Sequence, residues 1–410
     1  MKNRPVCLLA TASALLAAVA SPCSSAIVRF NATINSAQED TGSNSTASGS
    51  AVLVYDVTAN RFDLTVTIND FANTLTVSHI HEAAPGVSGP PMFDFGSGEA
   101  NYTRDGSTLT AAFASETYTG DPATLLSGGA YLNYHTASWP GGEVRGQLVP
   151  EVVKLNAILT PGQEPPPPPV VSSAYGALQA SYDPMSNEIS MLVCIFNFTN
   201  TLTNSHIHEA PVGVNGGVTL GFGGPAVYNK VGNAYVQYFA AQLYPRSVVN
   251  LLSERAYFNV HSNVYGSGEI RGQLYAQGSD SRGRVANVSA RGKVGTGDEA
   301  LITGFVIEGS EPVRVLATAR GPVLASFGVS GVLADPTMSV YDSAGNALFA
   351  NDNLASAPLG TMITASGLAP SEAAESVALL VLPPGAYTSV VSGAGGGTGI
   401  ALAEVFELVW

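Results

Sequence analysis

The sequence has little charge of either sign, and positive charge is the scarcer. Its 410 residues include 17 Lys and Arg against 31 Asp and Glu, so charged residues make up 12% of the chain and the net charge is −14. Nucleic acid is excluded as a partner, because no basic surface exists to neutralise phosphates. The shortage of Lys and Glu also argues against long surface helices, whereas 44 Gly and 25 Pro favour short strands joined by tight turns.

Long apolar runs are also lacking beyond the N-terminus. Lys2 and Arg4 precede the apolar run VCLLATASALLAAVA (Val6–Ala20), which is too short and too rich in Ala for a good membrane span, and small residues follow up to Ala26. This pattern predicts a cleaved secretory signal peptide over residues 1–26, with a retained N-terminal anchor as the alternative. We expect no transmembrane segment after cleavage. The expected location is extracellular or at the cell surface, with the periplasm as an alternative.

Cysteine is nearly absent. Cys7 and Cys23 lie in the expected signal peptide, and Cys194 lies inside the apolar run MLVCIFNF. A secreted chain without a disulfide framework must depend on its apolar cores. We expect Cys194 to be a small buried apolar residue.

Three segments recur in the same order along the chain. They are VRFNATINSAQED at Val28 with VKLNAILTPGQEP at Val153, SHIHEA at Ser78 and Ser205, and YLNYHTASWPGGEVRGQL at Tyr131 with YFNVHSNVYGSGEIRGQL at Tyr257. The offsets are 125 (153 − 28), 127 (205 − 78) and 126 (257 − 131) residues, which is the length of a whole domain rather than of a solenoid repeat. We therefore predict two copies of one domain, over 27–150 and 151–276. The proline run at 165–169 then lies inside the second copy.

Both copies have the pattern of antiparallel strands. In RFDLTVTIND, apolar residues alternate with polar ones, as in a strand with one buried face, and the counterpart NEISMLVCIFNF is more apolar on its outer face. Each copy is therefore predicted to be a β-sandwich or barrel. After a Ser, Gly and Arg linker at 277–284, residues 285–410 hold further strand candidates and form a third β domain. Its glycine-rich SGAGGGTG (Ser392–Gly399) lacks the context of a phosphate loop and is expected to connect a hairpin.

All six histidines belong to the repeat: His79, His81 and His135 in the first copy, and His206, His208 and His261 in the second. Residues i and i+2 of a strand share a face, so each H-x-H pair points one way and the intervening Ile points into the core. The third histidine, His135 or His261, lies on a later strand, and if that strand is close to the first, each copy carries a three-histidine cluster. Three neutral imidazoles can hold copper or zinc and leave one position open. The alternative is that these histidines cap strand ends and hydrogen-bond loop carbonyls.

Charged residues near the histidines are candidate supporting groups. They are Glu82, Glu143 and Arg145 in the first copy, and Glu209, Glu269 and Arg271 in the second. The glutamates are candidate hydrogen-bond partners of metal-binding histidines. Glu143 and Arg145 are two residues apart on a strand, so the pair could orient a histidine or be an exposed ion pair of small energetic weight.

The repeated segments resemble the chordin (CHRD) domain family. The resemblance rests on the H-x-H-E segment and on the Y-x-N-x-H-[ST] strand that runs into G-E-[IV]-R-G-Q-L, and it covers about residues 28–275. It implies an extracellular protein without an established enzymatic role, and in chordin the setting is extracellular binding of growth factors.

The CHRD family is faintly similar to Cu/Zn superoxide dismutase, an immunoglobulin-like barrel whose copper strand also reads H-x-H-E. That similarity implies copper-site positions for His79, His81 and His135 and a substrate-steering role for Arg145. The sequence departs from dismutase in having no fourth, bridging histidine, no disulfide pair and no zinc-binding loop, which puts dismutase activity in doubt. The fold class predicted is all-β, with two tandem immunoglobulin-like, superoxide-dismutase-like antiparallel β-barrels followed by a C-terminal β-sandwich.

The third domain resembles C-terminal β-sandwich modules of secreted bacterial proteins. Its oxygen-bearing residues could bind Ca²⁺ or could serve ordinary turns; they are Asp342, Asn346, Asn351, Asp352 and Asn353.

Two functions follow as hypotheses. The first is a secreted, non-catalytic protein that binds an extracellular protein or polysaccharide or associates with a surface, because the chain holds no complete catalytic constellation. The alternative is a copper- or zinc-binding protein, which could be redox-active, with a three-histidine site in each CHRD domain.

Overall fold

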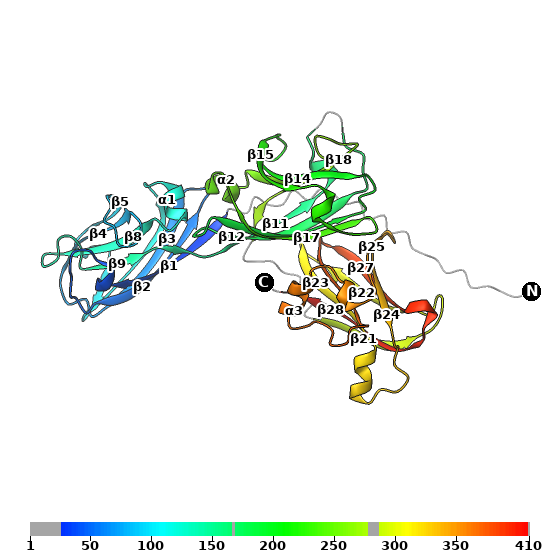
Figure 1. Cartoon of the computed structure of the whole chain (residues 1–410). Helices are drawn as coiled ribbons and strands as arrows, with labels where there is room; N and C mark the ends of the chain where they lie inside the picture. The colour runs from blue at the N-terminus through cyan, green and yellow to red at the C-terminus, as the bar shows by residue number, and fades with distance from the viewer. Residues whose placement is uncertain (1–25, 166–168, 278–286, 409–410) are drawn as a thin grey trace, which may run out of the picture.

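The regular structure in the described part of the chain is mainly antiparallel β-strand, as Figure 1 shows. The computed structural model describes residues 26–165, 169–277 and 287–408. The predicted all-β class is confirmed. The predicted signal peptide and linker, and the middle of the proline run, lie outside the described residues apart from their end positions. No helix in the described part of the chain is long and apolar enough to cross a membrane.

The first copy is one curled antiparallel sheet with strand order β5-β4-β8-β9-β1-β2-β3-β7-β6, and β10 also pairs with β1. Its elements are β1 (Ile27–Asn35), η1 (Ser36–Gln38), β2 (Ser48–Asp56), β3 (Arg61–Asn69), β4 (Leu75–Glu82), β5 (Pro91–Ser97), β6 (Thr103–Asp105), β7 (Thr108–Thr117), α1 (Pro122–Leu126), β8 (Ala130–Thr136), β9 (Val144–Gln147) and β10 (Val149–Pro150). Apolar residues alternate with polar ones along β1 and β3, and the buried set lines the inside of the curl. The sheet continues from β9 to β1 through the single pair Asn35–Arg145.

The second copy repeats this topology as two sheets, ordered β16-β17-β13-β12-β11-β20 and β15-β14-β18-β19. Its elements are β11 (Val153–Leu159), η2 (Pro161–Gln163), β12 (Tyr175–Asp183), β13 (Glu188–Phe196), β14 (Leu202–Glu209), β15 (Gly217–Gly223), η3 (Pro225–Val227), β16 (Asn229–Val231), β17 (Ala234–Leu243), α2 (Val248–Leu252), β18 (Ala256–Ser262), β19 (Ile270–Gln273) and β20 (Tyr275–Ala276). An isolated bridge between Thr160 and Arg271 joins the two sheets at the place where Asn35 and Arg145 pair in the first copy.

The C-terminal part is a sandwich of two four-stranded sheets, β21-β28-β23-β26 and β22-β27-β24-β25. Its elements are β21 (Asn287–Val294), β22 (Leu301–Ile307), β23 (Val313–Arg320), η4 (Pro322–Phe327), β24 (Pro336–Asp342), β25 (Ala347–Asn351), η5 (Leu354–Ser356), α3 (Gly360–Ala365), β26 (Ser376–Leu382), β27 (Gly385–Gly393), η6 (Ala394–Gly396) and β28 (Gly399–Glu407). The expected glycine-rich hairpin is wrong, because the flanking strands β27 and β28 belong to different sheets. The glycines instead let the chain cross the end of the sandwich, with positive φ at Gly395 and Gly396.

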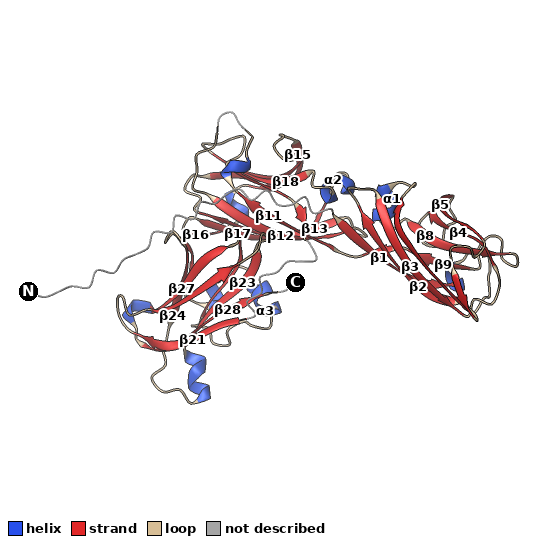
Figure 2. Ribbon diagram, turned by 180° about the vertical axis from the view of Figure 1, so that it is seen from behind, coloured by secondary structure: helices blue, strands red, loops and turns tan. Residues whose placement is uncertain are grey.

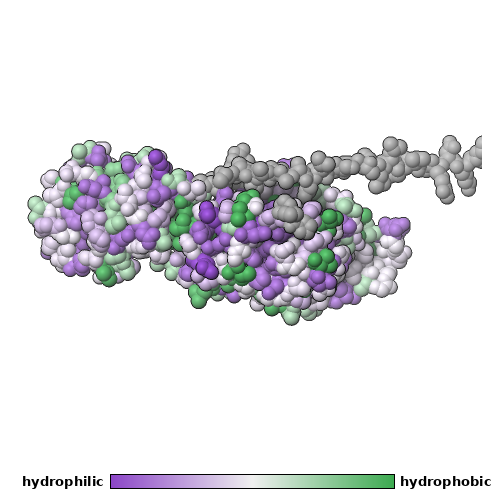
Figure 3. All heavy atoms as spheres, turned by 90° about the horizontal axis from the view of Figure 1, so that it is seen from above, coloured by the Kyte–Doolittle hydropathy of each residue, from purple (hydrophilic) through white to green (hydrophobic). Residues whose placement is uncertain are grey.

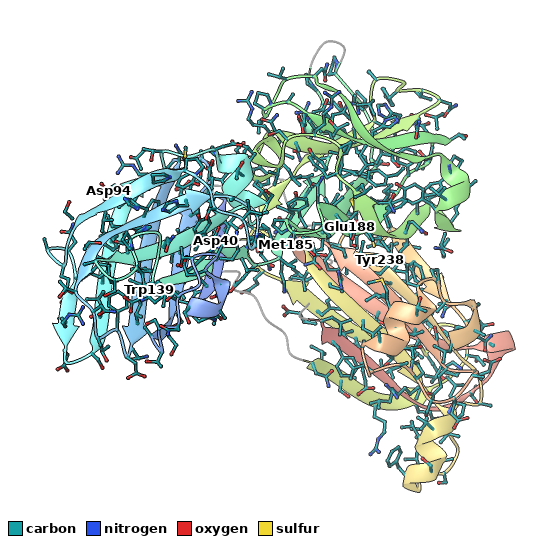
Figure 4. All side chains as sticks on the ribbon, turned by 60° about the vertical axis from the view of Figure 1, so that its left-hand side comes forward. Asp40, Asp94, Trp139, Met185, Glu188 and Tyr238 are labelled. Carbon is teal, nitrogen blue, oxygen red and sulfur yellow. The ribbon has the colours of Figure 1, made fainter. Side chains whose placement is uncertain are left out.

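The two copies meet end to end at α1 and α2, which lie side by side in both ribbon views (Figures 1 and 2). Gly128, after α1, has a φ of 73°, and a Cβ at this position would lie 2.5 Å from the Met185 Sδ. Figure 4 places Met185 at this junction. The chain passes between the copies in two residues, from β10 to β11.

The C-terminal sandwich packs against the outer face of the second copy. Strand β26 contacts β12 and β13, and Leu192, Cys194 and Phe196 of β13 are fully buried in a core shared with the sandwich. The expectation for Cys194 is met, since it is a buried free cysteine whose Sγ accepts a hydrogen bond from the Val381 backbone N–H (3.2 Å). The apolar outer face of this strand is therefore an interface between two parts of the chain.

Candidate functional site

The three histidines of each copy come together on two adjacent strands. His79 and His81 lie on β4, His135 lies on β8, and the register pairs His79 with Asn133 and Val77 with His135. The i, i+2 geometry puts His79 and His81 on one face, and the intervening Ile80 is fully buried on the other. The sequence predicted the shared face, and the pairing of β4 with β8 supplies the third histidine.

Backbone carbonyls fix the orientation of two rings in the first cluster. The Nδ1 atoms of His81 and His135 lie 2.8 and 3.0 Å from the carbonyl oxygens of Gly89 and Pro140. A carbonyl only accepts, so each Nδ1 carries the proton and each Nε2 keeps its lone pair. The His135 Nε2 lies 3.3 Å from the His79 Nδ1, whereas the His81 Nε2 is buried with no hydrogen-bond partner.

The second cluster repeats this arrangement. The Nδ1 atoms of His208 and His261 lie 3.0 and 3.1 Å from the carbonyl oxygens of Gly216 and Gly266. The His206 Nδ1 lies 3.1 Å from the His261 Nε2, and the His208 Nε2 is buried without a partner. In each cluster one ligand atom per histidine lies within 4.8 Å of the other two.

Burial keeps these imidazoles neutral near pH 7. Desolvation lowers the pKa of all six histidines, and it lowers the pKa of His135 and His206 to about 4. A neutral imidazole is the form that binds a metal ion. The clusters therefore offer lone pairs without a preceding loss of protons.

A tyrosine and an arginine hold the loop that carries Gly89. The Tyr131 ring stacks on His81 with centroids 5.1 Å apart, and its hydroxyl accepts a hydrogen bond from the Gly89 N–H (3.1 Å). The Arg145 guanidinium carbon lies 3.4 Å from the Tyr131 ring centroid, and its nitrogens donate to the carbonyls of Val87 and Ala84. The second copy uses Tyr257 with His208 and Arg271 in the same way.

Arg145 therefore does not have the steering position that the dismutase similarity implies. Strand β8 lies between β4 and β9, so Tyr131 separates His81 from Arg145. Arg145 and Arg271 are each only 1% exposed, so little guanidinium surface is available for guiding a substrate. Both arginines instead stabilise the loops beside the histidines.

The four candidate glutamates also differ from the prediction, because none is a hydrogen-bond partner of a histidine. Glu82 accepts from the Tyr118 hydroxyl and the Asp121 N–H, since a residue next to His81 on a strand faces the opposite side. Glu143 accepts from Ser45, Asn73 and Thr136. The counterparts behave alike: Glu209 accepts from Tyr244 and Asn250, and Glu269 from Ser172 and Asn200.

A buried polar cluster lies beside each triad, and sequence reasoning missed it. In the first copy, one carboxylate oxygen of Glu39 and the Oδ1 of Asn133 are buried with no partner, and a Cβ at Gly142 would lie within 2.6 Å of both groups. Burial raises the Glu39 pKa to about 7 despite the nearby Arg145 charge. The second copy repeats the cluster with Glu164 and Asn259. A cavity of ≈ 400 Å³ adjoins the first cluster, lined by residues 37–40, Pro85, Gly86, Arg145 and Gln147.

The candidate calcium ligands of the third domain serve turns. Asp342 accepts hydrogen bonds from the N–H groups of Ala344 and Asn346, and from the Asn346 side chain. Asn351 donates to the carbonyls of Asn353 and Val377. This is ordinary Asx-turn and capping chemistry.

Comparisons with known proteins identify the repeated part. The family profile described as "CHRD domain" matches residues 30–148 and 155–274, together more than half of the chain. No curated protein matches the chain.

Two solved structures show weak similarity. The pre-peptidase C-terminal domain of collagenase from Bacillus anthracis is 13% identical, with 29% of this chain and 88% of that chain covered and a TM-score of 0.19. The VP2 subviral particle of infectious bursal disease virus is 11% identical, with 91% and 74% covered and a TM-score of 0.16.

Proposed function

Because this chain belongs to the CHRD domain family, with two such domains in tandem, we propose that it is an extracellular, non-catalytic binding protein in which each CHRD domain holds one copper or zinc ion. The family and the secretory pattern at the N-terminus support the location. The three-histidine cluster in each domain supports the ion. Its proposed ligands are His79, His81 and His135 in the first domain, and His206, His208 and His261 in the second.

One observation carries the metal proposal: the buried Nε2 atoms of His81 and His208 have no hydrogen-bond partner. An unsatisfied buried nitrogen costs about 1–3 kcal/mol, so a site that repeats it in both domains calls for a partner. The neighbouring ring nitrogens define that partner. The Nε2 atoms of His81 and His135 are acceptors, and the His79 Nδ1 is one too when the His79 proton sits on Nε2, so a cation would satisfy all three nitrogens.

The distances fit such an ion. Two nitrogens that bind one ion at about 2.0–2.1 Å can lie at most about 4.2 Å apart, and tetrahedral binding puts them about 3.3 Å apart. The nitrogen pairs His79–His135 at 3.3 Å and His206–His261 at 3.1 Å match the tetrahedral separation. All three ligand nitrogens of each triad lie within 4.8 Å of one another, so an ion that binds all of them would draw the third ring inward.

Three nitrogens leave a fourth position for an outside ligand. The His79 side chain is 16% exposed, so solvent reaches the edge of the first cluster. When bound, the ion would supply Lewis acidity and, as copper, one-electron chemistry. A carboxylate or imidazole of an extracellular protein, or a carboxylate of a polysaccharide, could complete the coordination. Metal binding would then serve the binding of that partner.

A second candidate function is protein or polysaccharide binding without metal. The observation that favours it is the set of histidine–carbonyl bonds, which hold the loops beside each cluster. These loops expose Val87, Val212 and Val214. On the face seen in Figure 3, apolar residues lie in small separate groups among polar ones, so this face has no single large apolar patch.

Elemental analysis of the full chain, purified without a histidine tag and loaded separately with copper and zinc, distinguishes the two. We expect two ions per chain in the wild type, one in His81→Ala or His208→Ala, and none in the double variant. Asp63→Ala changes an exposed residue of β3 and serves as the control for metal lost during purification. A fully folded wild-type chain that retains neither metal would support the metal-free function, and circular dichroism verifies folding in every variant.

The proposal that the protein is non-catalytic is tested separately. The metal-loaded and metal-free chains are passed through hydrolase and redox assays. Turnover that disappears in the double histidine variant would contradict it.

A further inference from the structure

We infer that the two histidine sites are not equivalent, and that Asp94 gives the first site the higher affinity for a divalent ion. This inference rests on the proposed metal function. The histidine triads and their carbonyl partners repeat between the domains. The side chain opposite the first histidine of each triad does not.

In the first domain, β5 places a carboxylate beside that histidine. His79 pairs with Asp94 across β4 and β5, and the Asp94 Oδ1 lies 4.0 Å from the His79 Nε2. The same carboxylate oxygen accepts a hydrogen bond from the Gly96 N–H (2.7 Å), which restricts its position. Figure 4 shows Asp94 at the surface of this domain.

In the second domain, β15 offers no side chain at this place. His206 pairs with Gly221, the counterpart of Asp94 at an offset of 127 residues (221 − 94). The neighbouring pairs Ile80–Phe93 and Ile207–Leu220 confirm the alignment of the two hairpins. The Asp94 carboxylate interacts electrostatically with His79. Among the described residues, no carboxylate interacts in this way with His206.

The chemistry of the difference follows from the ring. When the Nδ1 of His79 binds the ion, its Nε2–H faces the carboxylate, which makes the imidazole a stronger donor and offsets part of the added positive charge. Such partners typically change metal affinity 10–100-fold. Asp94 is largely exposed, with 65% side-chain accessibility, so we expect an effect near the lower end, about tenfold.

The effect should depend on the charge of the ion. A carboxylate stabilises Cu²⁺ more than Cu⁺, because the interaction scales with the product of the charges. The first site should therefore favour divalent copper and zinc. The second site should discriminate less between the two copper states and should have the higher reduction potential.

The chain allows a reciprocal test, because either residue can be exchanged without crowding. A Cβ at Gly221 would have a single ordinary contact, 3.5 Å from the His206 ring, and Gly221 is not among the positive-φ residues. His208→Ala leaves only the first site and His81→Ala leaves only the second. Asp94→Asn is then added to the first variant, and Gly221→Asp to the second.

Cu²⁺, Zn²⁺ and Cu⁺ dissociation constants are measured on the metal-stripped full chain by competition with a coloured chelator. We expect the first site to bind Cu²⁺ and Zn²⁺ about tenfold more tightly than the second, Asp94→Asn to remove that advantage, and Gly221→Asp to create it. High salt should reduce the difference in affinity between the two sites, because salt screens the charge of the exposed Asp94. The Cu⁺ constants should change less.

Equal affinities at the two sites, or no change with Asp94→Asn, would overturn this inference while leaving the proposed metal function intact. Failure of both single-site variants and the wild type to bind any of the three ions would contradict the proposed function itself. Circular dichroism on each variant separates loss of binding from loss of folding.

Discussion

At the scale of single residues, strand geometry decides which neighbours of a histidine can act on it. Glu82 follows His81 directly in the sequence but faces the opposite side of β4 and bonds to Tyr118. Gly89 is eight residues away and supplies the carbonyl that orients the His81 ring. A partner that acts through its backbone leaves no residue-type signal, so the sequence pointed to glutamates where the structure uses carbonyls.

Glu39 and Glu164 predict a pH effect on stability. Burial raises the pKa of each carboxyl from 4.5 to about 7. Each therefore favours the folded state fully below pH 4.5, and that contribution is lost as the pH rises to about 7. The double variant Glu39→Gln, Glu164→Gln removes this loss, and each glutamine amide can donate to the unpartnered Oδ1 of Asn133 or Asn259.

We expect the difference in melting temperature, variant minus wild type, to be larger at pH 8 than at pH 5. Thermal unfolding at both pH values measures it on the metal-free chain. The histidines titrate in part of the same range with the opposite sign, but they are common to both proteins and cancel in the difference. A variant that tracks wild type at both pH values would contradict the assignment.

At the scale of elements, β3 and β13 show how one strand serves two surroundings. Their inward residues are apolar in both copies, and their outward residues differ. In β3, Thr65 and Asn69 are exposed, whereas their counterparts in β13, Leu192 and Phe196, are buried under the C-terminal sandwich. The sequence showed the apolar outer face, and only the packed structure shows what covers it.

This contrast predicts opposite outcomes for reciprocal substitutions. Leu192→Thr should lower the free energy of unfolding by about 2–5 kcal/mol, because it leaves a cavity and buries a hydroxyl in an apolar interface. Thr65→Leu, the matched change on exposed β3, should stay within about 0.5 kcal/mol of wild type. Urea denaturation measures both. Similar effects in the two variants would mean that the β13 face is not a packed interface.

At the scale of the whole molecule, we propose that the chain is two CHRD domains joined end to end and a sandwich docked on the second of them. The two repeated parts share a junction at α1, α2 and Met185. The sandwich buries the outer face of β12 and β13, so only the first CHRD domain keeps a polar outer face at this position.

A chain that ends at Gln277 should therefore self-associate, because it uncovers a contiguous apolar face. The triple change Leu192→Thr, Cys194→Thr and Phe196→Asn installs the residues found at the equivalent positions of β3, and should restore a monomer. Size-exclusion chromatography with light scattering measures the mass of each species. A monomeric truncated chain without the triple change would argue against this role of the sandwich.

The sequence by itself determined the all-β class, the duplication and the shared face of each histidine pair, because strand periodicity and repeated segments are local properties of the chain. It could not determine the partners of those residues. The approach of β8 to β4, the carbonyls at Gly89 and Pro140, the burial of Arg145 behind Tyr131 and the carboxylate of Asp94 beside His79 all depend on strand pairing and loop paths. Those are set by packing between distant segments, so only the tertiary structure decided them.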